Sequence, residues 1–340
     1  MTISSTKSGK SLLLAMLSYR RPAWSKTERR FIDTFLRPLG VREDAFGNLI
    51  KTVGDAPPEI LWSSHTDTVH SIGGTQRLSI AGDKVRADGA SNCLGADCTT
   101  GVWLMVEMIR ADIPGLYIFH REEEMGGVGS DNIARKTPEL LIGIKAAIAF
   151  DRKGTGSVIT HQAGGRCCSD AFAQSLSDVL SGLPCPLRAD SGGTFTDTAN
   201  YVDLVGECTN ISVGYRNQHT KGEEQDLAFA LALRDALLSA DLSQLVYRRF
   251  PGEVDACAWR GGRSGPSAGH GAFYGTYHWT DDEWWDEQAL ERERRPRAMT
   301  LHSIIRDYPD AVADWMEELG VNACDLANDL RQRGGMPYKY

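Results

Sequence analysis

The sequence lacks three features that would place it in a specialised class of protein. No stretch of its 340 residues approaches the roughly 20 consecutive apolar residues of a membrane-spanning helix, so we expect no membrane insertion. Eight cysteines do not make a disulfide scaffold in a chain of this length, and neighbours such as Cys167 and Cys168 rarely bridge. The 37 Lys and Arg are outnumbered by 45 Asp and Glu, and a net charge of -8 argues against a general nucleic-acid-binding protein.

The sequence also lacks a convincing export signal. The nearest candidate is the apolar run Leu12–Leu17, which is short and has no small-x-small cleavage site. Arg20 and Arg21 follow it at once, so we interpret this run as part of an amphipathic first helix. Because the cysteines are then expected to stay reduced, we predict a cytoplasmic protein.

What the chain does contain is an alternation of strand and helix patterns. Hydrophobic residues make up 41% and charged residues 24%, the balance of an ordinary globular protein. The predicted strands are Asn48–Val53, Glu59–Ser64, Leu116–His120, Lys145–Asp151 and Asn210–Val213. The predicted helices are two within 11–38, one after Gly101, Ser130–Arg135, Asp170–Leu180 and Glu223–Ser239. This alternation predicts an α/β protein in three layers, α/β/α, around a mostly parallel central sheet.

Metal-binding residue types recur at the ends of these predicted elements. His65, Glu123–Glu124 and Asp151 each follow an apolar strand, where ligands bind in parallel sheets. Asp97 precedes a predicted helix, and His219 precedes Thr220-x-x-Glu223, which has the form of a helix capping box. Imidazoles and carboxylates are ligands of hard and borderline cations.

Each of these segments also has an ordinary structural interpretation. His65 alone could be a hydrogen-bonded core histidine, Asp97 alone a helix N-cap, and Glu122–Glu124 alone a solvated acidic turn. Three successive carboxylates repel each other, however, and that favours a cation beside them. A carboxylate such as Asp97 has two oxygens and could bridge two cations about 3.5–4 Å apart. All five segments in one chain, in this order and at strand or helix ends, therefore predict a metal site.

The order of these motifs resembles the co-catalytic zinc peptidases of the M20 and M28 families. Their pattern is His-x-Asp, Gly-x-Asp before a helix, Glu-Glu, Asp or Glu, and His-[Ser/Thr]-x-x-Glu, and the match spans about residues 10–245. The resemblance implies a phosphorylase/hydrolase-like zinc peptidase fold with two zinc ions, for which Mn or Co could substitute. It assigns the metal ligands His65, Asp97, Glu124, Asp151 and His219, with Asp97 shared. It also makes Glu123 the general base. Asp67 would accept a hydrogen bond from the ring nitrogen of His65 that does not bind metal.

Three departures from the family pattern bear on these assignments. Cys98 stands where a second Asp is usual, and we favour an inert thiol over an altered metal preference. Glu122 lengthens the acidic run by one, so the base and the ligand could each be shifted by one place. The interval from Asp151 to His219 is 68 residues, too short for the lid domain that M20 enzymes insert there. It favours a compact, M28-like form.

The resemblance implies hydrolysis of an amide bond in a small peptide or aminoacyl substrate. An aminopeptidase, which we favour, needs an acid for the free amine, and Glu122 or Asp197 could serve. A carboxypeptidase or an N-acyl amino-acid amidohydrolase needs a cation for a carboxylate, for which Arg166 or Arg216 would fit. Tyr215 is a candidate for holding the oxyanion. A catalytically silent binding protein is the alternative outside the enzyme classes.

The composition changes near residue 250, which predicts the domain boundaries. Residues 1–250 would form the catalytic domain, 251–298 a Gly/Arg-rich and then acidic-aromatic linker or brace, and 299–340 a small helical module. The tryptophans among acidic residues fit either a surface that binds an unidentified protein or a brace on the catalytic domain. We favour the brace.

Overall fold

The computed structural model describes residues 3–89 and 91–253. Nearly all of the predicted linker and the whole of the predicted helical module at 299–340 therefore lie outside the described residues. Within the described ranges, no helix is both long enough and apolar enough to cross a membrane.

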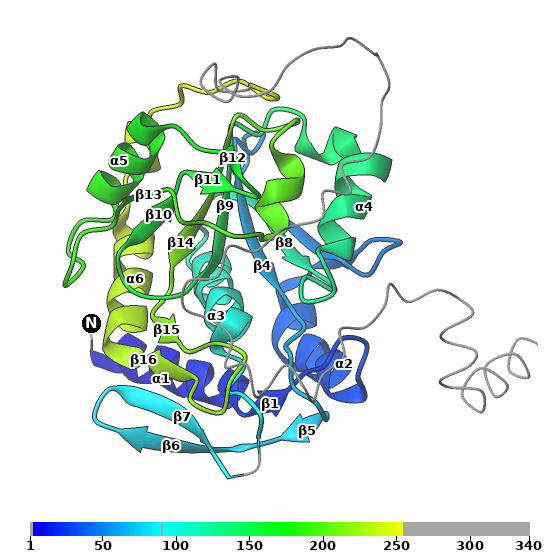
Figure 1. Cartoon of the computed structure of the whole chain (residues 1–340), viewed down its shortest axis with the longest axis vertical. Coiled ribbons are helices and arrows are strands. Elements are labelled where there is room, and N and C mark those ends of the chain that lie inside the picture. Colours follow the sequence, from blue (N-terminus) through cyan, green and yellow to red (C-terminus); the bar gives the residue numbers. More distant parts are fainter. Residues whose placement is uncertain (1–2, 90, 254–340) are drawn as a thin grey trace, which may run out of the picture. The chain divides into compact units, whose positions relative to one another are not determined.

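The centre of the fold is an eight-stranded, mostly parallel sheet (Figure 1). In spatial order its strands are β13 (Arg188–Asp190), β10 (Ser157–Ile159), β14 (Glu207–Ser212), β9 (Ala146–Arg152), β4 (Ile60–His65), β8 (Gly115–His120), β3 (Leu49–Val53) and β2 (Arg42–Glu43). Strands β14, β9, β4 and β8 run parallel to one another, and β3 runs antiparallel to β8. The carboxyl ends of these four parallel strands consequently meet at one edge of the sheet.

Helices cover both faces of this sheet, as two consecutive residues of β4 show, because their side chains point to opposite faces. Ser64 contacts Cys98 in α3 (Ala96–Arg110) on one face. Ser63 contacts His120, which contacts Tyr201 in the 3₁₀ helix η4 (Asp197–Tyr201) on the other. Helices α1 (Ile3–Leu17) and α6 (Leu227–Ser239) pack with α3, whereas α4 (Val128–Lys136) packs with η4. The predicted three-layer α/β/α fold is confirmed.

The remaining elements are short and lie around the central layers. The helical ones are α2 (Lys26–Phe31), the π-helical η1 (Ile32–Leu36), η2 (Arg37–Leu39), η3 (Pro138–Leu141), α5 (Asp170–Val179) and η5 (Leu242–Gln244). A small antiparallel sheet consists of β15 (Tyr215–Arg216), β16 (Glu224–Asp226), β7 (Lys84–Asp88) and β6 (Arg77–Ala81). Two further strand pairs are β1 (Tyr19–Arg20) with β5 (Gly74–Thr75), and β11 (His161–Gln162) with β12 (Gly165–Arg166). Because β10, β13 and β14 join the central sheet, no separate lid domain lies between β9 and β15, a stretch that the structure describes in full.

One predicted helix start is wrong. Glu223 does not cap a helix, because residues 224–226 form strand β16, in which Gln225 pairs with Val85 of β7. Helix α6 begins at Leu227 instead, and its N-cap is Asp226, whose side chain accepts a hydrogen bond from the Phe229 amide. The aspartate that ends the strand therefore takes the capping role predicted for Thr220, and this leaves Glu223 free for another contact.

Gly101 allows helix α3 to lie close against strand β9. A Cβ atom at this position would clash with the carbonyl oxygen of Phe150 and would lie 2.7 Å from the Cys98 sulfur. We expect Gly101→Ala to destabilise the fold by about 1–3 kcal/mol, because neither neighbour can move without shifting the strand or the helix. Thermal unfolding measures this effect. Gly156→Ala is the matched control, since a Cβ there meets no atom within 4 Å, and an equal loss in both variants would contradict the packing argument.

Candidate metal centre

His65 ends strand β4 and lies completely buried at the shared edge of the parallel strands. Its Nδ1 atom lies 3.1 Å from the carbonyl oxygen of Asp67 and 3.4 Å from the Asp67 carboxylate. Its Nε2 atom lies 3.1 Å from an oxygen of Asp97 and 3.4 Å from an oxygen of Asp151. Nδ1 is thus fixed by Asp67, two residues further along the chain, while Nε2 faces the carboxylates of Asp97 and Asp151.

Asp97 presents its two carboxylate oxygens to two different histidines. Its Oδ1 atom lies 3.1 Å from Nε2 of His65, and its Oδ2 atom lies 3.3 Å from Nε2 of His219. The backbone of Asp97 and Cys98 is not helical, and the peptide bond between them is cis, so the regular part of α3 starts after both. This arrangement is the one expected of a carboxylate shared between two cations.

Glu124 and His219 form the second part of the candidate metal centre, next to Asp97. Nε2 of His219 lies 3.0 Å from Oε1 of Glu124, and this histidine side chain is 39% exposed. Asp97, Glu124 and His219 can offer one ligand atom each within a sphere small enough for one metal ion, as can His65 with Glu123 and Glu124. The half with His65 is therefore buried, and the half with His219 opens towards solvent.

Asp67 connects His65 to the acidic turn after β8. Its Oδ1 atom accepts a hydrogen bond from the Glu123 amide at 3.3 Å, and its Oδ2 atom accepts one from the Glu124 amide at 3.2 Å. The same carboxylate lies against Nδ1 of His65. Asp67 therefore positions three candidate residues without reaching the cavity.

Asp151, near the end of β9, accepts hydrogen bonds from three neighbouring side chains. Its Oδ2 atom accepts a hydrogen bond from the Thr196 hydroxyl at 2.7 Å. The Tyr215 hydroxyl donates to its carbonyl oxygen at 3.0 Å, and the side-chain amide of Asn210 does the same at 2.9 Å. Asp151 is thereby oriented with its Oδ1 atom towards His65.

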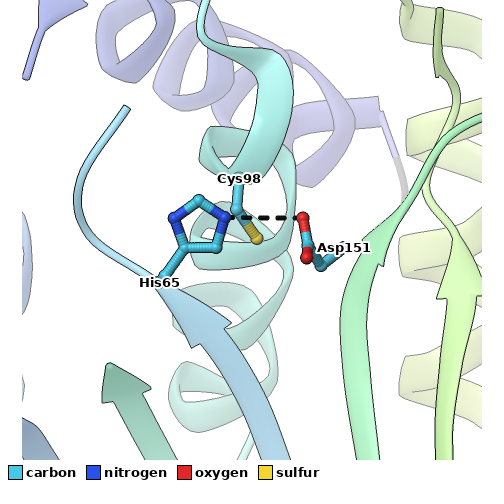
Figure 2. A group of neighbouring side chains, drawn as sticks. All are labelled: His65, Cys98 and Asp151. Atoms are coloured by element: carbon cyan, nitrogen blue, oxygen red, sulfur yellow. Dashed lines mark ion pairs between the residues drawn. The ribbon is translucent and has the colours of Figure 1, made fainter. Parts of the chain in front are cut away.

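Cys98 lies directly beside His65 and Asp151 (Figure 2). Its sulfur is 2.8 Å from the Ser64 hydroxyl and donates to the carbonyl oxygen of Phe150 at 3.0 Å. Burial raises the pKa of this thiol well above its ordinary value. His65, Cys98 and Asp151 can also offer one ligand atom each to a single metal ion, so the inert thiol favoured from the sequence stays a prediction.

The candidate metal centre contains more carboxyl groups than its two histidines can neutralise. Burial raises the pKa of Asp151 to about 8, and burial also raises the pKa of Glu123 well above its ordinary value. Burial alone would lower the pKa of His219, but hydrogen bonds to Asp97 and Glu124 raise it to about 11. Such a cluster of carboxylates with two imidazoles fits a pair of divalent cations, which would displace these protons.

Four of the five candidate metal ligands line one cavity together with Glu123, and the lining also includes residues that the sequence did not indicate. The cavity is lined by Asp97, Glu123, Glu124, Asp151, Arg152, Lys153, Ile159, Gln162, Gly193, Thr194, Phe195, Asn210, Tyr215, Gln218 and His219. Glu122 is not among these residues, whereas Glu123 and Glu124 are. Arg152 and Lys153 were not predicted, because nothing in the sequence distinguishes them from surface cations.

Three of the candidate substrate-binding residues lie outside the cavity lining. Arg166 is 3.0 Å from the carboxylate of Asp170, and Arg216 is exposed on β15. Asp197 is buried, and one of its carboxylate oxygens lies 3.3 Å from Nδ1 of His120. Tyr215 does line the cavity, with its hydroxyl on Asp151.

The fold is similar to that of several solved peptidases. The aminopeptidase PepT of Bacillus cereus is 16% identical over 69% of this chain and 98% of its own, with a TM-score of 0.57. A tripeptidase of Staphylococcus aureus is 13% identical over 69% and 97%, also with a TM-score of 0.57. A TET aminopeptidase from a marine sediment archaeon of the Thaumarchaeota is 13% identical over 70% and 97%, with a TM-score of 0.52.

No protein-family model and no curated protein sequence matches the chain. At identities of 13–16% the structural matches establish a shared fold.

Proposed function

We propose that the protein is a zinc-dependent aminopeptidase with two metal ions. The observation that carries this proposal is the carboxylate of Asp97, whose two oxygens face His65 and His219 separately. The solved structures with a similar fold include an aminopeptidase and a tripeptidase, which supports a peptide as the substrate. The absence of a domain inserted between β9 and β15 supports a compact, M28-like form within residues 1–250.

The proposed ligands form two sets that share one carboxylate. One set consists of His65, Asp97 and Asp151, and the other of Asp97, Glu124 and His219. When bound, the zinc ions supply a Lewis acid for the scissile carbonyl and lower the pKa of a bound water. Cobalt or manganese could replace zinc in this set of nitrogen and oxygen donors.

Glu123 is the proposed general base. Its carboxylate lies in the cavity, 3.9 Å from Nε2 of His65, and the hydrogen bond from its amide to Asp67 fixes its backbone. Burial raises the pKa of this side chain, and a raised pKa makes its carboxylate a stronger base, suited to accept a proton from water and to return it to the leaving amine. Asp67 and Tyr215 are proposed to position His65 and Asp151.

Two further parts of the proposal concern location and the rest of the chain. The six cysteines within the described residues are free thiols, which supports a reducing, cytoplasmic location. The residues after about 250 are proposed to brace the catalytic domain.

The test is the metal content of the purified chain, measured together with turnover. We expect about two equivalents of zinc per chain by elemental analysis, and cleavage of peptides with a free amino end that a chelator abolishes. Substrates with a blocked amino end, such as N-acyl amino acids, should be cleaved much more slowly. Preferential cleavage of the blocked substrates would indicate an amidohydrolase instead. Failure to bind metal after reconstitution would favour a binding protein.

A further inference from the structure

Besides acidic residues, the lining of the cavity contains two cations, Arg152 and Lys153. The metal ligands explain the acids, but a pair of divalent cations has no use for a guanidinium. We propose that Arg152 binds a carboxylate group of the substrate close to the bond that is cleaved. This inference rests on the proposed function and deepens it, because it names the chemistry of the preferred substrate.

A β-bulge brings Arg152 into the cavity directly after a proposed metal ligand. In the pairing of β14 with β9, Asn210 lies opposite Ala149, whereas Ser212 lies opposite Arg152, so β9 contains one residue more than its partner. Consecutive residues of a regular strand point to opposite faces. The extra residue changes this alternation, and both Asp151 and Arg152 line the cavity.

Arg152 is held in place by an acid that is itself fixed. Its Nη2 atom donates to Oδ2 of Asp190 at 3.3 Å, and the same oxygen accepts a hydrogen bond from the Ser157 hydroxyl at 2.7 Å. The other oxygen of Asp190 accepts from the Gly192 amide at 2.8 Å. The guanidinium is therefore oriented in advance, and such preorganisation lowers the entropic cost of binding a ligand.

The guanidinium retains capacity for a ligand. Its side chain lines the cavity and is 16% exposed, and among the described residues Asp190 is the one hydrogen-bond acceptor of its guanidinium. A guanidinium has five N–H donors, and its planar fork matches a carboxylate in two parallel hydrogen bonds. A carboxylate is thus the ligand that fits this part of the cavity best, with Lys153 adding positive charge beside it.

Two parts of a peptide could supply this carboxylate. One is the terminal carboxylate of a short peptide such as a tripeptide, and the other is an acidic side chain next to the scissile bond. Three otherwise identical peptides separate these sources: one with a free carboxyl end, one with an amidated end, and one amidated with an acidic residue beside the scissile bond.

The experiment compares kcat/KM for these peptides in the zinc-loaded wild-type protein and in Arg152→Gln. We expect wild type to prefer one carboxylate-bearing peptide over the neutral amide by roughly 10- to 100-fold, and Arg152→Gln to lose this preference. The zinc content of Arg152→Gln, measured by elemental analysis, should equal that of wild type, which shows that the metal centre is intact. Arg188→Gln, at an exposed arginine on β13, the strand that also carries Asp190, is the matched control and should keep the preference.

Further measurements separate failure of this inference from failure of the proposed function. Calorimetric binding of the same peptides to Glu123→Gln, with and without Arg152→Gln, reports the carboxylate contact without turnover. A preference that survives in Arg152→Gln, or no preference in wild type, would overturn the inference even if peptides are cleaved. Binding discrimination without any cleavage by wild type would support the carboxylate site and overturn the aminopeptidase. If Arg152→Gln does not fold, Asp190→Asn should weaken the preference in the same direction.

Discussion

Glu123→Gln should lower kcat for peptide hydrolysis by about 10³-fold or more and leave the metal content of the chain nearly unchanged. Glutamine has almost the same shape as glutamate, but it cannot accept a proton from water. The amide of residue 123 still bonds to Asp67, so the turn that carries Glu124 should stay in place. Single-turnover kinetics and elemental analysis on the same preparation measure the two effects.

The adjacent acids provide matched controls for this prediction. Glu122→Gln should keep its activity, because Glu122 does not line the cavity. Glu124→Gln should lose both activity and metal, because the contact of Glu124 with His219 belongs to the proposed ligand set. Wild-type rates in Glu123→Gln, or a loss of turnover in Glu122→Gln instead, would mean that the base is wrongly assigned.

The position of the candidate metal ligands could be predicted because it follows from topology. His65 and Asp151 end neighbouring parallel strands, and parallel strands place their carboxyl ends at one edge. Glu123 and Glu124 follow β8, which lies on the other side of β4. The positions of these residues at the ends of predicted strands thus sufficed to predict that they lie close together, with no knowledge of their side-chain contacts.

The contacts that could not be predicted depend on partners that are far apart in the sequence. Arg152 reaches the cavity through a bulge that only its pairing with β14 produces, and Asp190 orients it from another strand. Glu223 was predicted to cap a helix because the local Thr-x-x-Glu pattern fits that role. The pairing of β16 with β7 overrides this pattern, since a strand at 224–226 delays the helix.

Glu223→Ala should reduce both metal affinity and kcat/KM by roughly 10- to 100-fold, although this side chain is not among the residues that line the cavity. One oxygen of Glu223 accepts hydrogen bonds from the amides of Leu94 and Gly95, each at 2.9 Å. The other accepts from the amides of Ala96 and Asp97, at 2.8 and 3.2 Å. The carboxylate therefore fixes the loop that carries the shared ligand to the segment that carries His219. Zinc titration and steady-state kinetics measure the two losses.

Glu223→Ala should also lower the free energy of unfolding, because alanine leaves buried amide groups of this loop without a partner. Each such group costs about 1–3 kcal/mol when it is not satisfied, so the free energy of unfolding should fall by several kcal/mol. Glu224→Gln is the matched control at the next residue: Glu224 pairs with Arg86 at the surface, and such pairs contribute about 0–1 kcal/mol. A Glu223→Ala protein that is destabilised but binds zinc like wild type would show that Glu223 supports the fold without positioning Asp97.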